Sequence, residues 1–244
     1  MIKKYYYILF IIVLISLFYF VYDRSVNADE IVEDPNEKLV AISNNFPTKQ
    51  NIKNIIYNKV IVIGDSRMSL MRNRKNEIEI PTNFTFIADG GTKIDWFSQY
   101  ATVILKKILD SKDEKIQYHI LINMGVNDLD SRKKPEDISN GYYKLYYNLA
   151  KEYPTVKFYL LSVNPIDERI IYKKIGKNQL RTSAKIISYN KQLETNIIYS
   201  KVDNMKYCDS YNNLYFSSPD GLHYDSKTDE KIIDFMVNKC IIYE

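Results

Sequence analysis

Short, unbroken apolar runs recur along the chain, and they constrain its fold more than any other feature. The first, Val60–Ile63, is followed directly by Gly64-Asp65-Ser66. A run with no polar alternation indicates a strand that is buried on both faces, as in a parallel sheet. Further candidate strands are Phe84–Ala88, Tyr118–Asn123, Val156–Val163 and Met205–Cys208.

Segments with helical patterning lie between these runs. Pro135 suits the first position of one such helix. The alternation of strands and helices predicts an α/β fold, a single three-layer α/β/α domain whose central parallel sheet is covered on both faces. The candidate helices are Ile94–Leu109, Pro135–Lys151, Ser183–Ile198 and Ser226–Asn238.

The composition excludes several classes of protein. The chain has 244 residues, which suits one α/β domain of roughly 200 residues with appendages. Hydrophobic residues make up 45% and charged residues 26%, so the chain is not disordered throughout. A net charge of +4 with no block of basic residues argues against nucleic-acid binding. With only 2 His and 2 Cys, a zinc site of the usual Cys/His type is not expected.

The amino terminus indicates export. Two lysines precede Tyr5–Tyr22, a run of eighteen residues without a charge. Its length is close to the roughly 20 residues that span a bilayer, which favours an uncleaved anchor. The alternative is a cleaved signal peptide, because Val26–Ala28 offers small residues for cleavage. We therefore divide the chain into a signal anchor or signal peptide (1–28), a polar stalk (29–58) and the domain (59–244), with the stalk and domain outside the cytoplasm.

Export bears on the two cysteines, Cys208 and Cys240. Outside the cytoplasm such a pair can oxidise to a disulfide, and the alternative is two free, buried thiols. Neither cysteine has a histidine beside it in the sequence, which argues against a cysteine nucleophile.

Four polar blocks fall where ligands bind in parallel sheets, beyond the carboxyl ends of strands or in nearby loops. They are Gly64–Arg67, Asp89–Thr92, Gly125–Asp128 and Asp220–His223. Each has an ordinary alternative: a helix cap for the first, tight turns for the next two, and a surface histidine for the last. An Asp three residues before a His can also hydrogen-bond the imidazole and fix its tautomer.

Taken together and in this order, the blocks resemble the SGNH (GDSL-type) hydrolase superfamily. The resemblance spans Val60 to about Ile233 and implies a flavodoxin-like α/β/α fold. It implies Ser66 as the nucleophile, His223 as the general base and later acid, and Asp220 as the group that orients His223. The sequence departs from the pattern after the serine, where Arg67 replaces the Leu that is often found there.

The resemblance also implies an oxyanion hole. Its donors would be the Ser66 amide, the amide of either Gly90 or Gly91, and the Asn127 side chain. No metal and no organic cofactor are implied.

Other polar residues are expected to be structural. His119 lies inside an apolar strand run, and Asp65 and Asp128 are expected to brace their loops. Asn164–Thr182 is a polar connection that is too long for an ordinary turn, so we expect a lid at the rim of the site or a simple insertion.

These features lead to the hypothesis of an exported serine esterase or acyltransferase that acts on acyl esters, in particular O-acetyl esters of cell-wall or capsular glycans. A lipase or lysophospholipase that reaches lipid through its membrane anchor is an alternative. A non-catalytic scaffold of the same fold in cell-envelope assembly is another. The expected partners are the ester substrate and, through the N-terminal segment, the membrane. The oligomeric state is left open.

Overall fold

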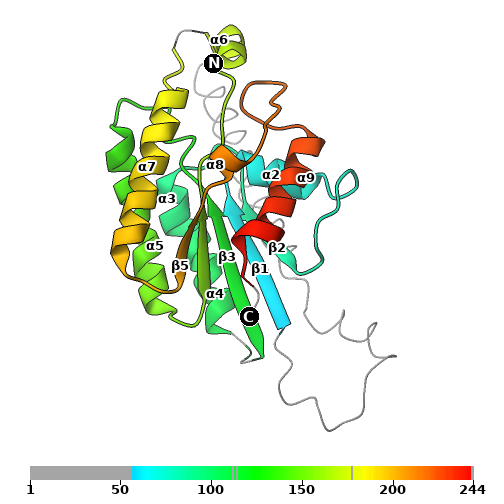
Figure 1. The fold of residues 1–244 in the computed structure, drawn as a ribbon, viewed down its shortest axis with the longest axis vertical. Coiled ribbons are helices and arrows are strands. Elements are labelled where there is room, and N and C mark those ends of the chain that lie inside the picture. Colours follow the sequence, from blue (N-terminus) through cyan, green and yellow to red (C-terminus); the bar gives the residue numbers. More distant parts are fainter. Residues whose placement is uncertain (1–56, 112, 114, 177, 243–244) are drawn as a thin grey trace, which may run out of the picture. The chain divides into compact units, whose positions relative to one another are not determined.

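A computed structural model describes residues 57–111, 113, 115–176 and 178–242. Its centre is a five-stranded parallel sheet of order β2-β1-β3-β4-β5 (Figure 1). This architecture confirms the predicted α/β fold. The strands are β1 (Tyr57–Gly64), β2 (Phe84–Ala88), β3 (Ile116–Asn123), β4 (Lys157–Leu161) and β5 (Met205–Cys208).

Strand β1 shows why unbroken apolar runs form this sheet. Ile61 and Ile63 belong to the apolar core on one face of the sheet, whereas Val60 and Val62 belong to the core on the other face. All four side chains are fully buried. Because successive side chains of a strand point to opposite faces, a strand between two cores must be apolar at every position.

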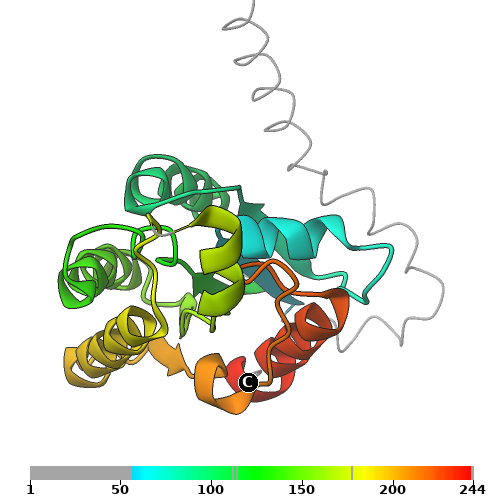
Figure 2. The same ribbon diagram turned by 90° about the horizontal axis from the view of Figure 1, so that it is seen from above.

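Helices cover both faces of the sheet, as Figures 1 and 2 show. Two groups of helices contribute apolar side chains to the two cores. The first is η2 (Phe97–Ala101), α4 (Thr102–Asp110), α5 (Pro135–Glu152), α6 (Glu168–Ile175) and α7 (Ser183–Ser200), with α3 (Ile94–Trp96) at its margin. The second is α2 (Ser66–Asn73), α9 (Ser226–Phe235) and η3 (Met236–Cys240).

The helices differ from the expected ones in two ways. The expected helix 94–109 contains a π-helical turn, η2, where Thr102 Oγ1 donates to the Phe97 carbonyl at 2.8 Å. The long connection 164–182 contains a helix that was not expected, α6 (Glu168–Ile175), which Asp167 caps and Gly176 ends at φ +83°. A second short helix, α8 (Ser210–Asn213), was also not expected.

The predictions for the amino-terminal part are not tested by this structure. The anchor or signal segment (1–28) and residues 29–56 of the stalk lie outside the described residues, and β1 begins two residues before the expected start of the domain. No helix in the described part of the chain combines the length and the apolar character needed to cross a membrane.

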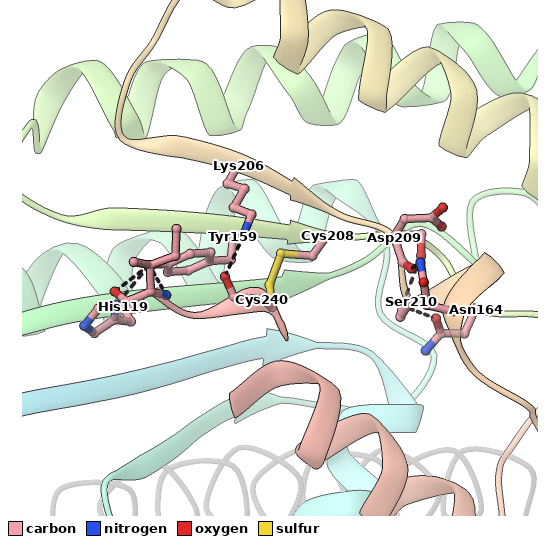
Figure 3. Close-up of a disulfide and its surroundings, with 11 residues drawn as sticks. His119, Tyr159, Asn164, Lys206, Cys208, Asp209, Ser210 and Cys240 are labelled. Carbon is pink, nitrogen blue, oxygen red and sulfur yellow. Dashed lines mark hydrogen bonds between the residues drawn. A yellow bond between two sulfur atoms is a disulfide. The ribbon is translucent and has the colours of Figure 1, made fainter. Parts of the chain in front are cut away.

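A disulfide joins Cys208, at the end of β5, to Cys240, at the end of η3 (Figure 3). Both residues are buried, and their Cα atoms lie 5.7 Å apart. Of the two alternatives for the cysteines, the structure thus contains the bridge. Lys206 Nζ also donates to the Cys240 carbonyl, at 3.2 Å. The carboxy-terminal helix is therefore fastened to the edge strand of the sheet.

His119 is buried in β3 and contacts neighbouring strands. Its Nδ1 lies 3.2 Å from the hydroxyl of Tyr159, and its Nε2 lies 2.9 Å from Asn58 Oδ1. These contacts are structural in kind, as expected for a histidine within an apolar strand.

Loss of the disulfide should destabilise the domain. The cysteines are 32 residues apart in the sequence, so the double substitution Cys208→Ser with Cys240→Ser should lower the free energy of unfolding by about 3–4 kcal/mol. Urea unfolding of both proteins measures this difference. Thiol titration of the unfolded, unreduced wild type is the control: we expect no free thiols, and two free thiols would contradict the bridge.

Candidate active site

The parallel register brings three of the four polar blocks to one edge of the sheet. Gly64, the last residue of β1, pairs with Ala88 at the end of β2 and with Asn123 at the end of β3. The loops that follow these residues therefore start side by side. They carry the Ser66, Gly90-Gly91 and Asn127 blocks. Figure 2 looks toward this end of the sheet, where α6 lies between the helices of the two faces.

Ser66 is the first residue of α2, and Asp65 rather than Ser66 caps that helix. The Asp65 carboxylate accepts a hydrogen bond from the Arg67 backbone N–H at 3.0 Å. Burial raises the pKa of Asp65, although the nearby Arg67 charge opposes this shift. As a cap, Asp65 braces the turn and leaves the half-buried Ser66 hydroxyl free to face the fourth block.

The fourth block completes a hydrogen-bonded chain of three side chains. His223 Nε2 lies 2.9 Å from Ser66 Oγ, and its Nδ1 lies 2.7 Å from Asp220 Oδ2. An Nδ1 proton held by the carboxylate leaves the Nε2 lone pair to accept the serine proton. The structure thus brings together the three residues that were expected to form a catalytic triad, from positions 157 residues apart.

Asp220 also shapes the loop on which His223 lies. Its Oδ1 accepts the backbone N–H groups of Leu222 at 2.8 Å and His223 at 2.7 Å. Partial burial works against the charge of Asp220, but the His223 backbone and imidazole and the Leu222 N–H outweigh it and lower its pKa to about 2. The carboxylate is therefore ionised throughout the neutral range.

Asn127 links the second and third blocks. Its Nδ2 donates to the Thr92 carbonyl at 3.0 Å, and the side chain is buried. The Gly90 N–H donates to Asp89 Oδ1 at 2.7 Å, so that amide already has an acceptor. Gly91 has a φ of +67°, and no hydrogen bond from its N–H occurs within the described residues. Of the two glycine amides considered for an oxyanion hole, that of Gly91 is the more available.

Asp128 braces the same region, as the sequence suggested. Its carboxylate accepts from the Tyr142 hydroxyl at 2.7 Å and from the Ile94 N–H at 3.3 Å. Burial raises its pKa, and the Tyr142 hydrogen bond opposes the shift. Asp128 thus joins the third block to α5 and to the start of α3.

Arg67 has a role in the site that its position in the sequence did not predict. This guanidinium is buried and donates through Nε to the Leu222 carbonyl at 3.1 Å and through Nη1 to the Asn164 carbonyl at 3.0 Å. It also lies 5.0 Å from the centre of the Tyr224 ring. Arg67 therefore ties the helix of Ser66 to both neighbours of His223. Its only signal in the sequence was the replacement of the usual Leu after the serine.

The long connection 164–182 packs against the same loop. The Asp167 N–H donates to the Gly221 carbonyl at 2.8 Å. Gly221 has a φ of +87°, and a Cβ there would lie 2.7 Å from the Asp167 carbonyl oxygen, so only glycine fits this close approach. The connection therefore lies at the rim of the site, one of the two placements expected for it.

The site contains the groups that acyl transfer needs, namely a nucleophile, a base and an orienting carboxylate. Within the residues that the structure describes, no three His, Cys, Asp or Glu side chains are grouped as metal ligands would be.

Comparisons with known structures support the fold. A GDSL-like lipase from Bacteroides thetaiotaomicron is 16% identical and superposes with a TM-score of 0.53, over 88% of this chain and 98% of that one. A carbohydrate acetylesterase from Sinorhizobium meliloti is 16% identical, with a TM-score of 0.50 over 73% and 97% of the two chains. An acetyl esterase solved with acetate is 14% identical, with a TM-score of 0.51 over 73% and 93%. At these identities the similarity concerns the fold.

The family is established by the sequence itself. No curated protein matches the chain significantly. The profile of the GDSL-like Lipase/Acylhydrolase family, however, matches residues 60–236, which is well over half of the chain and includes all four polar blocks. The protein therefore belongs to the GDSL-like lipase/acylhydrolase family, a family of hydrolases, as the order of its motifs predicted.

Proposed function

We propose that the protein is a serine esterase or acyltransferase that acts on short acyl esters, in particular O-acetyl groups carried by cell-envelope glycans. The observation that carries this proposal is the chain of hydrogen bonds from Asp220 through His223 to Ser66. It is the arrangement that a serine nucleophile requires.

The reaction has two steps. Ser66 Oγ attacks the ester carbonyl while His223 Nε2 takes its proton, and His223 then gives that proton to the leaving alcohol. A water molecule or a sugar hydroxyl attacks the acyl-enzyme in the same way and regenerates Ser66. Asp220 stays ionised and stabilises the imidazolium in both steps.

The negative oxygen of each tetrahedral intermediate would be held by the amides of Ser66 and Gly91 and by the Asn127 side chain. A single donor of this kind is typically worth about 10²–10³ in rate. The loop at Gly90 and Gly91 has space around it, since a Cβ at either position would meet no atom within 4 Å. A bulky, polar ester could approach from this side.

The surroundings of the catalytic loop favour a polar substrate. A hollow of about 340 Å³ lies beside this loop, between the start of α6 and residues 216–218. Most of the side chains that line it are charged or carry hydroxyls: Asp167, Glu168, Arg169, Ser183 and Ser218, with Pro165, Ile166 and Phe216. Neither Ser66 nor His223 lines this hollow, so it would hold a part of the substrate away from the ester. Such a lining suits sugar hydroxyls better than a long alkyl chain. The fold shared with a carbohydrate acetylesterase agrees with this proposal.

Ester hydrolysis tests the function. The full chain should hydrolyse p-nitrophenyl acetate faster than butyrate and much faster than palmitate. Ser66→Ala should lower kcat by about 10³-fold or more without unfolding the protein, because Ser66 is only half-buried and belongs to neither apolar core. A fluorophosphonate probe should label the wild type and not the variant.

The outcomes separate the alternatives. Preference for long chains would favour a lipase, and no turnover of any ester would favour a scaffold. Equal labelling of wild type and Ser66→Ala would refute Ser66 as the nucleophile.

Asp220→Asn should lower kcat by about 10²–10⁴-fold, because an amide cannot stabilise the imidazolium.

The folded-state pKa of Asp220, about 2, is below the ordinary 3.8, so its charged form stabilises the fold. This contribution is present above pH 3.8 and is lost as the pH falls through about 2. Urea unfolding should show the wild type more stable than Asp220→Asn down to about pH 4, with the advantage disappearing below. A loss of the advantage between pH 5 and 7 would contradict the lowered pKa.

We also propose that the domain lies outside the cytoplasm. The apolar run Tyr5–Tyr22 and the disulfide, a bond that persists in oxidising compartments, support this location. Protease added to cells stripped of any outer membrane and wall should degrade the protein if it is anchored outside the cytoplasm. If a signal peptide is cleaved, the protein should be released from such cells and begin near Asp29. Full protection inside the stripped cells would refute export.

A further inference from the structure

Asn127 can donate a hydrogen bond to an oxyanion only if its Nδ2 atom, and not Oδ1, points toward the substrate. An asparagine side chain has a donor and an acceptor end of nearly the same shape, and a rotation by half a turn exchanges them. In the rotated state the Oδ1 atom would take the place of the donor, next to a negatively charged oxygen. The site therefore needs a device that fixes the orientation of Asn127.

The structure contains such a device in Arg181. Its Nη2 donates to Asn127 Oδ1 at 3.3 Å, while Asn127 Nδ2 donates to the Thr92 carbonyl at 3.0 Å. A rotated amide would place Oδ1 against the Thr92 carbonyl and its NH₂ group against the guanidinium. Both contacts would be repulsive, so the two partners together select one orientation. One Nδ2 proton is then bonded to the Thr92 carbonyl, and the second has no acceptor among the described residues, so it can donate to a substrate oxygen.

The Arg181 side chain is held in place by contacts with the loop that carries Asn127. Its Nε donates to the Val126 carbonyl at 3.0 Å, and its guanidinium lies 3.3 Å from the Asp130 carboxylate. Its side chain is only 11% exposed. Gln179 Nε2 donates to the Arg181 carbonyl at 2.7 Å, which anchors its backbone as well. The guanidinium therefore spans the peptide before Asn127 and the Asn127 side chain itself.

The charge of Arg181 adds to the geometry. A guanidinium that donates to Oδ1 polarises the amide and makes its N–H groups stronger donors. A lysine could supply a similar charge, but a single ammonium does not reproduce the planar, two-point contact with Val126 and Asn127.

We propose that Arg181 is a positioning residue for the oxyanion hole, which acts by holding the Asn127 amide with a proton toward the substrate. This inference rests on the proposed esterase function. It assigns a catalytic purpose to the connection 164–182, which follows β4 and contacts the loop that follows the neighbouring strand β3.

A double-mutant cycle tests the proposal. Asn127→Ala should lower kcat by about 10²–10³-fold. Arg181→Met should lower kcat by about 10–10²-fold with KM nearly unchanged, because the lost interaction matters in the transition state. If Arg181 acts through Asn127, adding Arg181→Met to Asn127→Ala should cost less than about threefold more. If the double variant loses kcat by the full product of the two single-variant factors, the proposal is overturned.

Arg74 provides a matched control. It too donates to a backbone carbonyl, that of Tyr224 at 2.7 Å, and pairs with an aspartate, Asp229, but it does not contact Asn127. Whatever the factor by which Arg74→Met lowers kcat, that factor should be the same in the wild type and in Asn127→Ala. If Arg181→Met does not fold, Arg181→Lys replaces it in the same cycle.

A second measurement does not depend on turnover. The side-chain amide ¹H–¹⁵N signals of Asn127 are those that disappear in Asn127→Ala. They should shift or broaden in Arg181→Met and stay in place in Arg74→Met. Unmoved signals in Arg181→Met would overturn the proposal. A wild type that cleaves no ester would refute the esterase function, and these signals would still decide whether Arg181 holds Asn127.

Discussion

The parallel pairing of β1 with β2 and β3 is the constraint on which the site depends. It pairs Gly64 with Ala88 and with Asn123 at the carboxyl ends of the strands, so the three loops that follow begin next to one another. The pairing is stabilised by burial on both faces, where the side chains of β1 pack into two separate cores. Ser66 and the candidate oxyanion donors lie close together because each follows a strand, and these strands are neighbours in the sheet.

His223, the candidate base, is far from Ser66 in the sequence, and three kinds of contact hold it near the serine. Asp220 shapes the His223 loop locally through backbone N–H groups. Arg67 joins this loop to the helix of Ser66, and the disulfide fastens the following helix to β5. Arg67 and Arg181 are both buried and donate to backbone carbonyls. Such carbonyls would be costly to leave unpaired, so each guanidinium holds two segments at a set separation.

Much of this could be predicted from local pattern. The continuous run at Val60–Ile63 predicted a central parallel strand, and all five strands lie where apolar runs indicated, with ends that differ by a few residues. The helix α6 was missed because it is only eight residues long and lies within a long connection that is polar as a whole, although its own sequence is amphipathic at the helical period. The π-helical turn η2 was missed because its apolar spacing differs little from that of an ordinary helix.

The sequence by itself determined the fold class, the family, and the residue types available as nucleophile, base and orienting acid, since these follow from short patterns and their order. Only the tertiary structure decided that Cys208 and Cys240 form a bridge, that the Gly90 amide donates to Asp89 while the Gly91 amide has no acceptor among the described residues, and that Arg181 reaches Asn127. Each of these depends on distances between groups that no sequence pattern specifies. A bridge, a free amide or a guanidinium contact exists only once packing has brought its partners to within a few ångströms.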